Sequence, residues 1–204
     1  MLYPHRAPKP RNIHLVRLVA GTELLRIYDR SKYNVKGKTF RSFGPLERFD
    51  HHSFQRDGIP RIDPSRRVWY GALEFSTSLV EVFGETRLIE YPNRRVAVVT
   101  LRRDVELLDL ANGAMAAGTV AALAATTDRH LSQSWSRHFY RHTRFFRNID
   151  GLYYNGAHNN GLCMMLYERA EDAVQCPENS TRTLADPRWR PEILSAIRDY
   201  NLNE

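Results

Sequence analysis

With 204 residues, of which 42% are hydrophobic, the chain is long enough to bury an ordinary core and too apolar for a disordered protein. No apolar run approaches the roughly 20 residues that span a bilayer. Two cysteines, Cys163 and Cys176, are too few for a disulfide framework and do not form a C-x-x-C metal site. The formal net charge of +7 favours an anionic partner, which could be a nucleotide, a nucleic acid or an acidic protein.

The chain begins with a basic, proline-containing lead and two predicted strands. Residues 1–12 lack the apolar centre of a secretion signal, so we expect a loose lead on a cytoplasmic protein. Residues 13–19 and 24–28 are predicted strands separated by a glycine turn. Alternation along the second strand places Arg26 and Tyr28 on one face. That position suits an arginine that lines a cleft and equally one that is exposed to solvent.

Polar loops are predicted at residues 29–44 and 51–66. Between them, Arg48 follows a Gly-Pro turn and is a candidate anion clamp, because guanidinium offers a planar fork of donors. An ion pair of Arg48 with Glu47 or Asp50 is the alternative.

Residues 67–85 are predicted to form a strand, a tight connection and a helix. The β-formers of 68–70 include Tyr70, and residues 76–78 (Ser-Thr-Ser) offer a helix N-cap before an apolar run. Glu81 lies inside that run. A buried carboxylate is costly unless it is paired, hydrogen-bonded or used in chemistry. The alternative is that Glu81 faces solvent from the edge of an amphipathic helix and Tyr70 belongs to the core.

The second half of the chain predicts four more strands and three helices. The strands are expected at residues 96–101, 105–110, 150–154 and 162–167. The helices are expected at 111–127, 131–146 and 190–200. His138 and His142 lie four residues apart, but no third ligand is near them, so no metal site is expected. We predict one domain over residues 1–173, with residues 174–204 as an extension packed on it.

The order of several short motifs resembles the RES-domain family, toxins of bacterial toxin–antitoxin pairs named for an arginine, a glutamate and a serine. No single motif is specific, but the ordered set covers about residues 14–170. The matching pieces are Leu25-Arg26-Ile27, Glu47-Arg48-Phe49-Asp50, Tyr70 with Ala72 and the helix of Glu81, Ser134-Trp135-Ser136, Asp150-Gly151-Leu152-Tyr153-Tyr154 and Leu166-Tyr167-Glu168-Arg169.

The resemblance implies an α+β fold like that of ADP-ribosyltransferases, with small mixed or antiparallel sheets and surrounding helices around a cleft for NAD. It implies that NAD is the substrate and is cleaved or used for ADP-ribose transfer, and that the partner is a helix-turn-helix antitoxin. Direct nucleic-acid binding is then expected only through the antitoxin. The sequence leaves the oligomeric state open. No Rossmann G-x-G-x-x-G is present, so redox use of NAD is unsupported.

The resemblance also assigns roles to residues. Glu81 would stabilise the oxocarbenium-like centre formed when the nicotinamide–ribose bond breaks. Tyr70 would stack on nicotinamide, and Arg26 and Arg48 would hold the pyrophosphate. The remaining predicted substrate-binding positions are Tyr28, Asn155 and Gly156.

One position departs from the family pattern. The serine that normally comes two residues after the tyrosine of the G-x-x-Y segment is replaced by Gly156. This departure motivates one alternative to an active enzyme, an inactive RES-like module that still binds NAD or an antitoxin. A second alternative rests on the positive charge and the histidines alone: a basic RNA-cleaving toxin that uses His130, His138 or His142.

Overall fold

The structure, a computed structural model, describes residues 2–31, 35–53 and 57–204, and it is α+β as the sequence predicts. Its helices are α1 (Phe75–Phe83), α2 (Arg129–Arg141), α3 (Thr143–Phe146) and α4 (Arg190–Tyr200). Its strands are β1 (Leu15–Leu18), β2 (Glu23–Asp29), β3 (Phe43–Gly44), β4 (Arg61–Ile62), β5 (Val68–Ala72), β6 (Arg94–Leu101), β7 (Val105–Asp109), β8 (Gly151–Asn155), β9 (Leu162–Tyr167), β10 (Val174–Gln175) and β11 (Thr181–Thr183).

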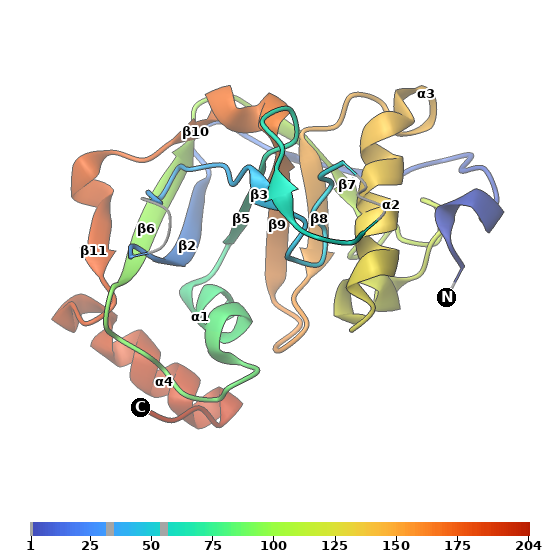
Figure 1. The fold of residues 1–204 in the computed structure, drawn as a ribbon. Coiled ribbons are helices and arrows are strands. Elements are labelled where there is room, and N and C mark those ends of the chain that lie inside the picture. Colours follow the sequence, from blue (N-terminus) through green and yellow to red (C-terminus); the bar gives the residue numbers. More distant parts are fainter. Residues whose placement is uncertain (1, 32–34, 54–56) are drawn as a thin grey trace.

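Within these residues, nine strands form one sheet in the order β1-β7-β8-β9-β5-β2-β6-β10, with β11 also paired to β6 (Figure 1). All neighbours are antiparallel except β7 and β8. The strands β5 and β2 are joined by a single residue pair, Leu25 with Ala72. The sheet therefore consists of two halves that meet at a narrow seam, and this seam positions the site described below. The strands β3 and β4 form a separate ribbon.

Helices cover the two halves separately (Figure 1). The apolar face of α2 packs with Trp135 and Phe139 on a core that includes Leu152 and Met165 of β8 and β9. The helices α1 and α4 pack together against β2 and β6. The segment after residue 173 adds β10 and β11 to the edge strand β6 and then forms α4, so it continues the second half of the sheet. None of the helices in the described ranges is both long and apolar enough to cross a membrane.

Several predicted elements are confirmed, and three need correction. The structure confirms the strands predicted around 24–28, 68–70, 96–101 and 162–167 and the helix at 190–200. The helix predicted at 111–127 is wrong: the segment forms turns and a short 3-10 helix, Ala121–Ala125. Gly118 has a φ of 84°, a left-handed conformation that interrupts a helix.

The other two corrections concern a break within one predicted helix and the first residue of another. The helix predicted at 131–146 divides at His142, whose φ of −94° and ψ of 59° are not helical. In α1, Glu74 occupies the N-cap position, and the Ser-Thr-Ser segment at 76–78 lies inside the helix. The hydroxyls of that segment are available to other parts of the chain, and two of them contribute to the site.

Candidate active site

A cleft of about 470 Å³ lies at the seam between the two halves of the sheet. It forms because β2 and β5 pair only at Leu25 and Ala72 and separate beyond that point. Where they separate, the Ile27 N–H donates to the Ser78 hydroxyl of α1 at 3.1 Å. The helix thus takes a position beside β2 that another strand would occupy in a continuous sheet.

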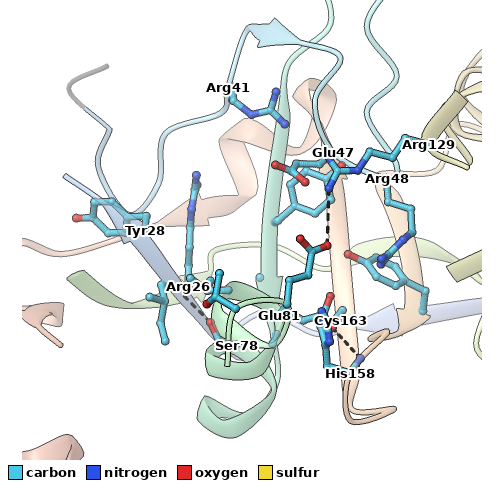
Figure 2. A pocket seen from close by; sticks show the side chains of 18 residues that line it. Arg26, Tyr28, Arg41, Glu47, Arg48, Ser78, Glu81, Arg129, His158 and Cys163 are labelled. Carbon is cyan, nitrogen blue, oxygen red and sulfur yellow. Dashed lines mark hydrogen bonds and ion pairs between the residues drawn. The ribbon is translucent and has the colours of Figure 1, made fainter. Parts of the chain in front are cut away.

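The cleft is lined by charged side chains of both signs (Figure 2). In the view, Tyr28 and Arg26 lie on one side of Glu81, and Arg48 and Arg129 lie on the other. The charged lining residues are Arg26, Arg41, Glu47, Arg48, Glu81, Glu85 and Arg129. Four guanidinium groups among three carboxylates suit an anionic ligand whose positively charged part lies near a carboxylate.

Arg26 lines the cleft, but part of its guanidinium is already used. Its Nη1 donates to the carbonyl oxygens of Thr39 at 2.8 Å and Gly37 at 3.3 Å. The guanidinium lies 5.6 Å from the Trp69 ring and 5.9 Å from the Tyr28 ring. Burial, and then the charge of Arg41, lowers the pKa of Arg26 to about 10, so it stays charged at neutral pH. Arg26 therefore holds the loop before β3 as well as lining the cleft.

A buried carboxylate fixes Tyr70 and Arg41. Asp50 is fully buried and accepts from Arg41 Nη2 at 2.8 Å through both of its oxygens. The Tyr70 hydroxyl donates to Asp50 Oδ1 at 2.8 Å. Burial and the Asp50 charge raise the pKa of Tyr70 well above its usual value, so the phenol remains a donor. Of the two partners suggested for Arg48, Glu47 and Asp50, the second is instead paired with Arg41.

Arg48 lies beside the part of the cleft formed by β8 and β9. Its Nε donates weakly to the Thr126 carbonyl at 3.4 Å. Its charge acts on Tyr154 and Cys163, both of which line the cleft. Burial, and then the Glu81 charge, raises the pKa of Cys163, so this residue stays a thiol and is a poor nucleophile.

Glu81 projects from α1 into the cleft and contacts the loop between β8 and β9. The His158 N–H donates to Glu81 Oε1 at 3.4 Å. A Cβ atom on Gly156 would lie 2.8 Å from the same oxygen. Glu81 is therefore half-buried and lies between the cleft and this loop, while Tyr70 both lines the cleft and packs against the core.

The structure brings together most of the predicted site residues. Those that line the cleft are Arg26, Tyr28, Arg48, Tyr70 and Glu81. Asn155 and Gly156 are not among the lining residues. Asn155 pairs with Leu162 in the sheet, and Gly156 lies behind the Glu81 carboxylate, which itself lines the cleft.

Sequence reasoning missed several cleft residues. Arg41 and Arg129 lie in segments predicted as a loop and as the residues before a helix, where nothing marks an arginine as special. Ser78 could have been found, because it precedes Glu81 by three residues and shares its helix face. The missed residues are Arg41, Ser78, Glu85, Arg129 and Cys163.

The histidines of the RNA-cleavage alternative are not among the residues that the structure shows lining the cleft. The ring of His138 packs 5.5 Å from that of Phe146 and 5.6 Å from that of Trp135. Burial, and then His142, lowers the pKa of His138 to about 4. In the described part of the chain, no group of three or more His, Cys, Asp or Glu side chains could hold a metal.

Comparison with known proteins agrees with this architecture. The family model of the RES domain matches residues 23–190. The fold is similar to that of a chain in the crystal structure of the M. tuberculosis MbcT–MbcA toxin–antitoxin complex, with a TM-score of 0.56 and 14% identity. The match covers 86% of this chain and 90% of that chain. No curated protein sequence matches. The structural likeness shows a common fold, and the matched residues include the whole cleft.

Proposed function

This chain belongs to the RES-domain family, and we propose that it is the toxin of a toxin–antitoxin pair that cleaves NAD at the nicotinamide–ribose bond. The observation that carries the proposal is the position of Glu81, a carboxylate in a cleft that also presents four guanidinium groups. NAD has matching chemistry, because it combines an anionic pyrophosphate with a cationic nicotinamide ring and a ribose carbon that becomes more positive as the bond breaks.

In the proposed reaction, the chemical step depends on Glu81. Nicotinamide leaves with the electron pair of the C–N bond and becomes neutral, while positive charge develops on the ribose. Glu81 stabilises that charge and orients the acceptor, whose oxygen forms the new bond to C1′ and whose proton passes to Glu81 or to solvent. The acceptor is water, phosphate or a protein group.

The remaining lining residues bind and orient NAD. Tyr70, fixed by Asp50, offers an aromatic ring to nicotinamide. Arg48 is the stronger candidate for the pyrophosphate, because only its Nε donates to Thr126, whereas Arg26 already donates to two loop carbonyls. Tyr28 lines the same side of the cleft as Arg26 and would contact the other end of the dinucleotide.

The test is to incubate the purified protein with NAD, with and without phosphate, and to identify the products. Release of nicotinamide supports the proposal, and the product that carries ADP-ribose identifies the acceptor. The matched variant Glu81→Gln keeps the shape of the side chain and removes its charge. We expect its turnover to fall by about a hundredfold or more, while NAD binding measured by calorimetry changes little. Equal turnover in both proteins would reject the role of Glu81.

The glycine at position 156 favours a second candidate, a RES-like module that binds NAD without cleaving it. The same assay separates the two. NAD binding with no nicotinamide release, from either the parent or Gly156→Ser, would establish the binding module and reject the enzyme.

For the partner we propose an antitoxin that covers the cleft. Support comes from the structural relative, which is described as part of a toxin–antitoxin complex, and from the arginines of the cleft, which suit an acidic segment or a terminal carboxylate. Expression without an antitoxin should arrest growth and deplete NAD before other nucleotides fall. Growth arrest with unchanged NAD and degraded RNA would favour the RNA-cleaving alternative.

A further inference from the structure

The helix α1 packs against the loop between β8 and β9 through glycine residues on both sides of the contact. Positions 77, 81 and 84 are separated by four and three residues, so they lie on one face of α1 and its C-cap. The loop itself is closed by a hydrogen bond of 2.7 Å from Gly156 N–H to the Gly161 carbonyl. Each of the three positions on the helix side meets one residue of this loop.

The contacts are close at all three positions. A Cβ atom on Gly161 would lie 2.0 Å from Thr77 Oγ1, and one on Gly84 would lie 2.6 Å from the His158 ring. Between them, a Cβ atom on Gly156 would lie 2.8 Å from Glu81 Oε1 and 3.1 Å from its carboxyl carbon. Two hydrogen bonds add to the contact, from Asn159 Nδ2 to Thr77 and from the His158 amide to Glu81.

The need for glycine at position 156 comes from space and not from backbone conformation. Glycines with a left-handed φ in the described ranges are Gly21, Gly58 and Gly118, and Gly156 is not among them. The backbone would therefore accept alanine or serine without torsional strain. What stands in the way of such a side chain is the Glu81 carboxylate, together with Cys163 Sγ at 3.2 Å.

We propose that Gly156 is a positioning residue, whose missing side chain leaves the space that holds the Glu81 carboxylate against the His158 amide. The carboxylate is the far end of a flexible side chain, so a Cβ atom here would turn it away at little cost in stability. The consequence for catalysis rests on the function proposed above. A serine at position 156 would then lower turnover instead of restoring it, because it would displace the group that stabilises the transition state.

The proposal is tested first by nuclear magnetic resonance, without reference to activity. In the parent protein, replacement of the Glu81 carboxylate by Glu81→Gln should move the His158 amide resonance, and we call this dependence on Glu81 the amide response. Gly156→Ala should abolish the amide response, so that adding Glu81→Gln to it no longer moves the resonance, while Ala157→Ser, which adds a hydroxyl at the neighbouring position, should leave the response intact. An amide response that is unchanged in Gly156→Ala would overturn the proposal.

The second measurement is NAD cleavage. In Gly156→Ala and Gly156→Ser, kcat should fall by about tenfold to a hundredfold, and KM for NAD should change by less than about twofold, because a displaced catalytic group affects turnover more than binding. Full kcat in both variants would reject the positioning role and leave the proposed function standing. If Gly156→Ala loses the amide response and the parent never cleaves NAD, the positioning role stands and the proposed function is rejected.

A third variant covers the case in which Gly156→Ala does not fold stably. If Gly156→Ala is destabilised by its contact with Cys163, the double variant Cys163→Ala/Gly156→Ala removes the sulfur and keeps the contact with Glu81. The same loss of the amide response and of kcat is expected there, relative to Cys163→Ala alone. Recovery of both in the double variant would show that the effect came from the sulfur and would contradict the proposal.

Discussion

At the scale of single residues, Asp50 connects the loop before the cleft to the cleft itself. Its fully buried carboxylate accepts from Arg41 and Tyr70 and from the backbone amides of Leu46 at 2.6 Å and Glu47 at 3.0 Å. The Asp50 carboxylate and the Arg41 guanidinium depend on each other, because removal of either charge leaves the other one buried without a partner.

Two variants should separate the charge of Asp50 from the hydroxyl of Tyr70. Asp50→Ala leaves the guanidinium of Arg41 without its carboxylate and should lower the free energy of unfolding by about 3–5 kcal/mol. Tyr70→Phe removes one of several donors to Asp50 and should cost about 1 kcal/mol. Urea unfolding measures both. Equal costs would contradict this account of the site.

Much of the site could be predicted at this scale, but its internal pairing could not. The order of motifs indicated that Arg26, Tyr70 and Glu81 would come together, and all three line the cleft. The pairing of Arg41 with Asp50 depends on how the loop between them folds, which no local pattern encodes. Asn155 was predicted to bind substrate from its position in a motif, but sheet pairing places it outside the lining residues.

At the scale of elements, the two longer helices near the cleft begin in different ways. The Asp128 carboxylate accepts from the Leu131 N–H at 3.0 Å and caps α2. Glu74 occupies the same position in α1 and makes no capping hydrogen bond with its side chain. In α1, Ser78 bonds to β2 and Thr77 accepts from Asn159 of the β8–β9 loop, so these hydroxyls serve tertiary contacts.

This difference gives a matched pair of variants. Asp128→Ala should destabilise the protein by about 1 kcal/mol, because it leaves an N–H of the first turn without its acceptor. Glu74→Ala should leave the stability nearly unchanged. Thermal unfolding followed by circular dichroism compares them directly. A loss in Glu74→Ala as large as that in Asp128→Ala would show that capping is not the cause.

Helices and strands could be predicted where the pattern of neighbouring residues determines them. The strands β6 and β9 contain short, continuous apolar runs, whose length and flanking residues favour a strand over a helix. The alanine-rich segment at 111–127 has a helical composition, but its Gly118 turns left-handed beside the Pro8 carbonyl, which a Cβ atom would approach to 3.0 Å. That contact comes from a distant part of the chain, so composition could not reveal it.

At the scale of the whole molecule, stability should fall as the solution becomes acidic. Burial lowers the pKa of His51 below its usual value, and it lowers that of His138 to about 4. The unfolded chain therefore takes up protons first, and stability that is complete above about pH 6.5 is lost towards pH 4. The loss is at most about 1.4 kcal/mol per pH unit for each group, and smaller at the partly exposed His138 because of solvent screening.

Urea unfolding at pH 7.5 and pH 5.5 measures this loss. His138→Phe keeps an aromatic ring between Trp135 and Phe146 and removes the titrating group, so its stability should fall less than that of the parent over this interval. His130→Gln, which changes an exposed side chain at the start of α2, serves as the control and should behave like the parent. Identical pH dependence in His138→Phe and the parent would exclude a contribution from His138.

The strand order also determines when the cleft can form during synthesis on the ribosome. The strands β2 and β6 are both complete by residue 101 and can pair as soon as they emerge. On the other side of the seam, β5 has to wait for its neighbour β9, which ends at residue 167. Every shorter nascent chain lacks part of the wall that holds Tyr154 and Cys163 in place, so the cleft is among the last features of the molecule to assemble.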